Sequence, residues 1–230
     1  MHPAASAGAI LRVAIAAGKF QGVTSAATPT GRWVTMVRTC SPPYSPTCHV
    51  HLGGRHGPAV IPLTDENYQR VAALATTDLH RAVLILVAVH GARPHMVRYL
   101  RLNDVDLVRR RLTLNGVTRE LDDLGHQVLT DWLGHRRELW PLCANPFLLV
   151  SRTSAYGLQP ISSTHVRELF RGSGVTLDRL RMDRNLEEAL VYGPDPLHLA
   201  ALFGISEATA IRYTHQARLL RASQPEPRSP

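Results

Sequence analysis

The stretch from Leu177 to His215 constrains the fold of this chain most, because it encodes three helices and the breaks between them. The first helix carries Arg181 and ends before a Gly-Pro-Asp-Pro sequence at 193–196, where glycine and proline interrupt helical structure. A short apolar helix follows, and a last helix presents Tyr213. An arginine and a tyrosine near opposite ends of such a unit are the groups needed to hold a phosphate and to attack it.

The chain before this stretch predicts further helices. Thr64 caps a helix that extends to about residue 75, and a second, strongly apolar helix runs from about Leu79 to His90. Gly91 ends the second helix, and Arg93-Pro94 begins a new one, since proline favours the first helical position.

Two short strands, Arg111–Leu114 and Val117–Leu121, form the clearest hairpin signal in the sequence. They are joined at Asn115-Gly116, a pair that favours the two-residue turns connecting antiparallel strands. A long amphipathic helix is predicted next, from Leu124 to Trp140. Its inward face is expected to carry Leu129, Trp132 and Leu139.

Two shorter elements separate this helix from the three-helix stretch. Phe147–Val150 is predicted to be a short strand, and Ser163 is expected to cap a helix that ends at about Arg171. Within the helix of Arg181, the acidic pair Glu187-Glu188 is expected to face solvent. No segment alternates strand and helix as a doubly wound fold requires. The sequence therefore predicts a mainly α domain with one small antiparallel β-sheet, an α+β fold.

Residues 1–61 differ from the rest, because they contain no aspartate or glutamate and are dense in small residues and proline. They predict a basic, irregular N-terminal extension, followed by a globular domain at 62–221 and a disordered tail at 222–230. The extension suits either an arm along a phosphate backbone or a poorly ordered remnant. Zinc-ligand residue types also occur here, but their spacing matches no paired-ligand motif: Cys40, Cys48, His49 and His51.

The charge of the chain favours an anionic partner, nucleic acid before a membrane, because the net charge is +8 and the isoelectric point is about 10.1. The basic residues are almost all arginine, Lys19 being the only lysine, and guanidinium groups bind phosphate bidentately. Three cysteines give no disulfide framework, and Arg12 interrupts the N-terminal apolar run that a signal peptide would need. A cytoplasmic, nucleoid-associated protein is therefore expected.

Two blocks of the sequence together resemble the tyrosine recombinase (phage integrase) family. The first, HGARPHMVRYLRLNDVDL at 90–107, is similar to the box around the family's first catalytic arginine and places that arginine at Arg93. The second, at 177–215, resembles the box that carries His-x-x-Arg, a Leu-Gly-His turn and Thr-x-x-Tyr, with matches at Arg181 and Tyr213. The resemblance covers about residues 62–220, the whole predicted globular part.

The resemblance implies a specific chemistry. Arg93 and Arg181 would clamp the oxygens of a DNA phosphate and stabilise the charge of its transition state. Tyr213 would attack that phosphate, form a 3′-phosphotyrosyl link and release a 5′-hydroxyl, so that no metal, nucleotide or other cofactor is expected. The implied partner is double-stranded DNA, with a second copy of this chain or another recombinase as an oligomer on it, and no membrane.

The positions that handle protons in the family are changed here. Asp178 stands where the first box histidine is expected, and Ile205 replaces the histidine of the Leu-Gly-His turn. The hairpin has no lysine, and Arg119 is the only cation on its second strand. Arginine is a poor general acid because its pKa is high. These accessory positions predict a degenerate member that binds DNA with reduced or lost cleavage.

Two other interpretations remain open. A helix-turn-helix regulator could use residues 197–216, with Thr209, Arg212 and Gln216 directed at a major groove. A non-catalytic helical interaction domain would instead pair Arg181 with Asp183 or Glu187 and bury Tyr213 as an ordinary core residue.

Overall fold

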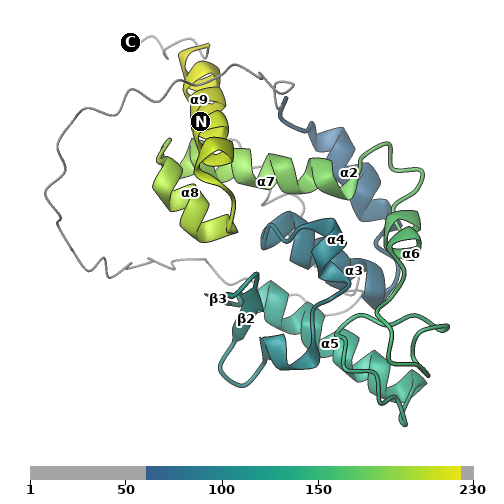
Figure 1. Ribbon diagram of the computed structural model, residues 1–230. Helices are drawn as coiled ribbons and strands as arrows, with labels where there is room; N and C mark the ends of the chain where they lie inside the picture. The colour runs from purple at the N-terminus through teal and green to yellow at the C-terminus, as the bar shows by residue number, and fades with distance from the viewer. Residues whose placement is uncertain (1–60, 224–230) are drawn as a thin grey trace, which may run out of the picture. The chain divides into compact units, whose positions relative to one another are not determined.

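The computed structural model describes residues 61–223, whose elements are shown in Figure 1. The expected N-terminal extension, with its zinc-ligand residue types at 40, 48, 49 and 51, lies outside the described residues, and so does the tail at 224–230. The first described helix, α2 (Asp65–Leu74), is capped as predicted: the Thr64 hydroxyl accepts a hydrogen bond from the backbone N–H of Asn67.

The apolar helix predicted at 79–90 is observed, but its last turn differs from an α-helix. It consists of α3 (Asp78–Leu84) continued by a π-helix, η1 (Ile85–Val89), whose end is closed by a bond from His90 N–H to Ile85 O. Every residue of η1 is buried. Gly91, with φ of 67°, ends this segment. Arg93 is then the N-cap of α4 (Pro94–Val97), as predicted.

The hairpin has the predicted strands and turn. β2 (Arg111–Leu114) pairs antiparallel with β3 (Val117–Glu120), and Leu114 opposes Val117 next to the turn. Positive φ angles of 52° at Asn115 and 78° at Gly116 explain why this residue pair occupies the turn. A two-residue strand, β1 (Val105–Asp106), adds to β2 after the 3-10 turn η2 (Leu102–Asp104), which gives the sheet order β1-β2-β3.

The long helix α5 (Asp123–Leu139) buries Leu129 and Trp132 as predicted, but Leu139 is 52% exposed. The prediction for Leu139 is wrong, because Arg136 and not Leu139 is the buried residue of the last turn of α5. The prediction of a strand at Phe147–Val150 is also wrong, because only Phe147 forms a β-bridge. The segment is held instead by side chains, since Arg136 and the Trp132 indole donate to the carbonyl of Leu148.

The remaining helices follow the predicted order. α6 (Ser163–Glu168) is capped by Ser162 rather than by Ser163, and it ends before the predicted Arg171. The three helices of the organising stretch are all present, with α9 ending one residue into the predicted tail: α7 (Leu177–Val191), α8 (Pro196–Phe203) and α9 (Glu207–Ala222). The fold is thus mainly α with one small antiparallel sheet, as predicted.

Buried apolar side chains form two clusters. The larger one, the main core, draws on α2, α3, η1, the hairpin, α5, α6 and the first turn of α7. The smaller one, the C-terminal cluster, lies where α8 and α9 pack against α7 (Figure 1). Its buried members are Leu186, Ala189, Leu199, Phe203, Ile205, Ala210, Tyr213 and Ala217. α7 contributes to both clusters and therefore connects them. None of the helices within 61–223 is long and apolar enough to cross a membrane.

Candidate functional site

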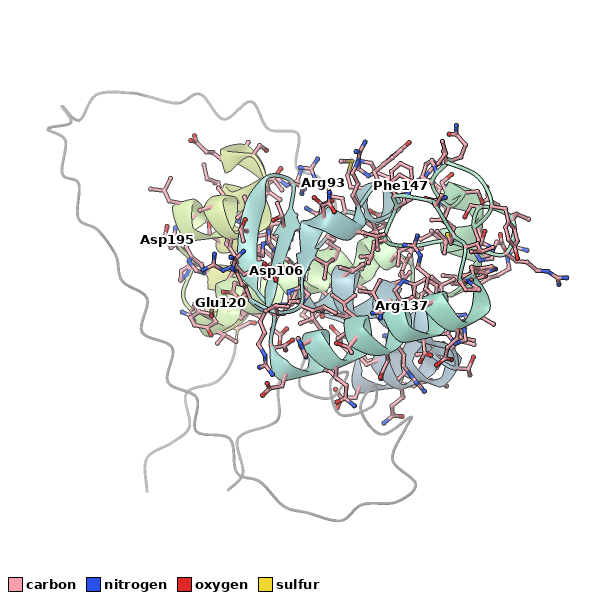
Figure 2. All side chains as sticks on the ribbon, turned by 90° about the horizontal axis from the view of Figure 1, so that it is seen from below. Arg93, Asp106, Glu120, Arg137, Phe147 and Asp195 are labelled. Carbon is pink, nitrogen blue, oxygen red and sulfur yellow. The ribbon has the colours of Figure 1, made fainter. Side chains whose placement is uncertain are left out.

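Arg93 stands at the start of α4, beside the hairpin (Figure 2). It lines a hollow of about 160 Å³ together with the hairpin turn at 113–116. Its Nη2 donates to the carbonyl oxygen of Gly204, at 3.3 Å. Because Gly204 is the C-cap of α8, this bond joins the arginine box to the turn between α8 and α9, 111 residues later in the chain.

Arg181 lies on α7 and faces the same region. Its Nε donates to the carbonyl oxygen of Gly91 at 3.0 Å, two residues before Arg93. Burial lowers the pKa of Arg181; the Tyr213 phenol nearby acts in the opposite direction, and the positive charge of Arg93 lowers the pKa further. Asp178, one turn earlier on α7, raises it. The two arginines thus bind backbone next to one another, at Gly91 and at the turn between α8 and α9, and α9, which carries Tyr213, packs against α7.

Tyr213 is presented by α9 with its ring in the C-terminal cluster, where it is 4% exposed. Its hydroxyl makes no hydrogen bond with any other residue of the described range. Ile205, which the sequence resemblance aligns with a histidine, is buried in the same cluster and offers no proton-carrying group. The structure therefore brings together Arg93, Arg181 and Tyr213, with Asp178 as the nearby carboxylate.

The pairing of Arg181 with Asp183 or Glu187, which the interaction-domain interpretation expects, does not occur. Asp183 accepts instead from the Leu63 N–H at 2.8 Å and from the Tyr68 hydroxyl, which ties α2 to α7. Burial raises the pKa of Asp183 above its ordinary value. Arg181 is left to bind a backbone carbonyl and to face Arg93 and Tyr213.

Three guanidinium groups, which we call the arginine collar, bind the end of the π-helix. Arg184 donates to Val89 O at 3.1 Å, Arg119 donates to His90 O, and Arg181 donates to Gly91 O. The last carbonyls of a helix lack intrahelical partners, and charged donors satisfy them well. The collar thus fixes the backbone that leads directly into Arg93.

Phe203 sits between two members of the collar. Its ring centre lies 5.6 Å from the guanidinium of Arg119 and 5.7 Å from that of Arg184, within the range of cation–π contacts. Its edge is so close to Gly91 that a Cβ there would lie 2.5 Å from Cδ1 of the ring. Burial, with Arg184 and Arg181 nearby, lowers the pKa of Arg119 to about 10. Arg119 thus has two contacts in this region, the carbonyl oxygen of His90 at the end of η1 and the ring of Phe203.

Glu188 is a buried part of this region, so the expectation that it faces solvent is wrong. It is 4% exposed; one carboxylate oxygen lies 2.7 Å from Arg184 Nη2 and the other lies 3.0 Å from His198 Nε2. A buried carboxylate needs such partners, and here it offsets part of the positive charge of the collar. The i to i+4 spacing of Arg184 and Glu188 was a usable signal in the sequence.

The three residues proposed to read a DNA groove from α9 have different environments. Arg212 is exposed, whereas Thr209 and Gln216 are half-buried. The Thr209 hydroxyl lies 2.9 Å from the Ser206 hydroxyl, which caps α9. A short turn at 204–206 joins α8 to α9, and Gly204 has a φ of 58° there.

Metal ligands do not gather in the described part of the chain: no three histidine, cysteine, aspartate or glutamate side chains there could hold an ion together. The guanidinium groups of Arg181 and Arg93 lie in the region of Tyr213, and guanidinium groups bind anions. What the site can hold is a group with several negatively charged oxygens.

Comparison with known proteins shows the fold. The chain matches no protein-family model and no curated protein sequence. It does resemble the crystal structure of XerA recombinase, with a TM-score of 0.58 and 22% identity over 74% of this chain and 66% of that one. The XerH site-specific recombinase bound to its palindromic difH substrate gives a TM-score of 0.55 and 17% identity, over 72% of this chain and 53% of that one.

The integrase of the transposon Tn1549, in complex with transposon right-end DNA, is also similar. Its TM-score is 0.50 at 15% identity, over 75% of this chain and 69% of that one. This chain therefore spans about two thirds of XerA and about half of XerH. The expected tyrosine-recombinase catalytic-domain fold is confirmed.

Proposed function

We propose, on the premise of this shared fold, that the chain binds duplex DNA and holds one backbone phosphate between Arg93 and Arg181, beside the hydroxyl of Tyr213. The observation that supports the proposal is the meeting of these three side chains from three separate segments. Both guanidinium groups donate to backbone carbonyl oxygens, and a phosphate offers them stronger, charged acceptors.

The proposed reaction is a transesterification. The phenol oxygen of Tyr213 attacks the phosphorus, the bond from phosphorus to the 5′-oxygen breaks, and a 3′-phosphotyrosine ester remains. The phenol loses its proton and the departing 5′-oxygen gains one, so no oxidant or cofactor takes part. Arg93 and Arg181 stabilise the negative charge of the pentavalent transition state.

Cleavage by this chain alone should be slow. A phenol holds its proton at neutral pH, and the positions that carry histidines in the family are Asp178 and Ile205 here. Arg119, the remaining accessory candidate, binds the end of η1. DNA binding is therefore the proposed main activity, and strand breakage and rejoining the slower one.

Assembly and location are parts of the same proposal. XerH and the Tn1549 integrase were solved with DNA, which supports duplex DNA as the partner here. A second copy of this chain or another recombinase would complete the assembly on DNA, at the nucleoid. Arg212 on the exposed face of α9 would contact the duplex in the manner of a helix-turn-helix protein.

Covalent trapping tests the proposal. Purified protein is incubated with nicked or phosphorothiolate suicide duplexes from its own genomic neighbourhood, and protein–DNA bands that resist denaturant are measured. A weak band that disappears in both Tyr213→Phe and Arg181→Ala is the expected result. If the protein retards the DNA in a salt-dependent way but forms no covalent band, its function is DNA binding alone, as a regulator or as a recombinase without catalytic activity. Without retardation at low salt, the DNA proposal fails and an interaction domain remains.

A further inference from the structure

A second hollow lies next to the arginine pair and includes the first two residues of α4 in its lining. It has a volume of about 620 Å³ and is formed by the start of α4, by α6 and by the segment that leads into α7. Pro94, which directly follows Arg93, belongs to its wall, and so does Asp178, one turn before Arg181. The hollow is therefore adjacent to the place where the proposed function puts a DNA phosphate.

The lining of this hollow suits a flat ring with polar edges. Its floor consists of buried apolar side chains: Pro94, Val166, Phe170, Val175 and Leu177. Its rim carries exposed polar ones. Pockets of this size with an apolar lining and a few polar groups hold ligands of roughly nucleotide size. A DNA duplex is too wide to enter, but one unstacked nucleotide is not.

Three side chains on the rim are available to a ligand. His95, Arg167 and Asp178 make no hydrogen bond or ion pair with any other described residue. Arg171, by contrast, is paired with Glu168 at 2.6 Å. Arg167 and His95 can donate to a phosphate or sugar oxygen, whereas the carboxylate of Asp178 can only accept.

Asp178 is the residue that decides the kind of ligand. A carboxylate beside a phosphate site repels phosphate oxygens, so its presence next to Arg181 is unfavourable for backbone binding alone. The edges of guanine, cytosine and adenine carry amino groups that donate to a carboxylate. Guanine fits best, because its ring N–H and amino group are adjacent donors that match the two carboxylate oxygens.

We propose that this hollow takes up one unstacked base next to the phosphate held by Arg93 and Arg181, with Asp178 selecting a base that bears an amino group, guanine above all. The proposal rests on the proposed DNA binding. Unstacking a base costs a few kcal/mol, least where the base is already unpaired. A duplex with one bulged guanine should therefore bind more tightly than a fully paired duplex.

The test measures affinity by fluorescence anisotropy for three end-labelled duplexes of one sequence: fully paired, with one bulged guanine, and with one bulged thymine. Thymine is the matched probe because carbonyl oxygens flank its only ring N–H. We expect bulged guanine to bind about tenfold more tightly than the other two. Asp178→Ala should abolish the preference for guanine over thymine, while its thermal midpoint stays close to that of the wild type.

Glu138→Ala provides the charge-matched control, since Glu138 is an exposed acid on α5. Both variants lose one negative charge and should bind paired DNA slightly better, but only Asp178→Ala should lose the base preference. Equal affinity for all three duplexes would overturn the base pocket and leave DNA binding intact. An unchanged guanine preference in Asp178→Ala would also overturn it. Absence of binding to every duplex would overturn both proposals.

Discussion

The main core and the C-terminal cluster are built differently, although α7 runs through both. The main core is a continuous apolar interior in which the whole of η1 is buried. The C-terminal cluster has eight buried apolar residues and meets the rest of the protein through polar contacts as well, in which Arg93 binds Gly204 and the collar surrounds Phe203. Apolar burial is non-directional, whereas hydrogen bonds depend on angle and distance. The position of Tyr213 relative to Arg181 is therefore set by apolar packing of α9 on α7, whereas its position relative to Arg93 depends also on the hydrogen bond from Arg93 to Gly204.

The largest expected effect comes from a variant in the C-terminal cluster. Phe203→Ala should cost about 3–5 kcal/mol in the free energy of unfolding, because a buried ring is lost and a cavity remains. Urea unfolding measures this loss, and hydrogen exchange measures its location. Amides of α8 and α9 should lose protection while those of α5 keep theirs.

The matched variant for that experiment is Phe170→Ala, which removes a buried phenylalanine from the main core. Its loss of stability should be similar, but α5 should lose protection together with the rest of the core. If Phe203→Ala lowered protection equally in α5 and α9, the two clusters would form one cooperative unit instead of two.

A smaller effect is expected from filling the contact between the clusters. Gly91→Ala places a methyl group against Phe203 at a backbone φ of 67°. Overpacking costs about 1–3 kcal/mol, and a left-handed backbone adds about 1–2 kcal/mol for a residue with a Cβ. Gly116→Ala is the control, because φ is 78° there and no atom lies within 4 Å of the added Cβ. Thermal unfolding should show a greater loss for Gly91→Ala; equal losses would mean that the Phe203 contact is not tight.

The next prediction concerns the polar contact between α2 and α7. Because burial raises the pKa of Asp183, the folded state holds its proton more tightly than the unfolded chain does. The stability from this group is fully present below the ordinary pKa of an aspartate and is lost as the pH rises through the raised pKa. Asp183→Asn removes this titration and keeps an oxygen for the Leu63 N–H. Urea unfolding should therefore show the variant gaining stability relative to wild type as the pH increases; parallel pH profiles would refute the assignment.

The smallest effect on stability is expected from the surface of the C-terminal cluster. Arg212→Ala removes an exposed side chain and should change the free energy of unfolding by less than about 0.5 kcal/mol. It should weaken DNA binding and lower the slope of log affinity against log salt by about 1. Arg137→Ala, an exposed arginine on α5 (Figure 2), is the control and should leave that slope unchanged. If both variants lowered the salt slope equally, the DNA would not bind preferentially at α9, and the assignment of Arg212 to the DNA contact would be wrong.

Local signals in the sequence were sufficient for much of the fold. Thr64, Gly91 and Asn115-Gly116 each act on the backbone within a few residues, so their effects could be predicted from neighbours alone. Arg93, Arg181 and Tyr213 were identified through the resemblance of two sequence blocks to the tyrosine recombinase family, and the structure places them in one region. Their roles in binding and cleavage are still predictions.

The rest depends on contacts between distant segments. The collar joins β3 and α7 to the end of η1, and no pattern within one helix reveals that Arg119 and Arg184 meet there. Glu188 was predicted to be solvated because carboxylates usually are, and its burial depends partly on His198, which reaches it from α8. Phe147–Val150 has the composition of a strand, but a strand also needs a neighbour to pair with, which composition does not report.

The π-helix η1 determines the orientation of the residues that follow it, including Arg93. An α-helix turns by about 100° for each residue, whereas η1 closes its last bond over five residues instead of four. Removing one residue from 85–89 would restore α-helical phase and rotate everything that follows by a large angle. The orientation of Arg93 toward Gly204 thus depends on the number of residues in η1 as well as on their types. A one-residue deletion in η1 can turn the guanidinium away from Gly204 although every side chain of the site is retained.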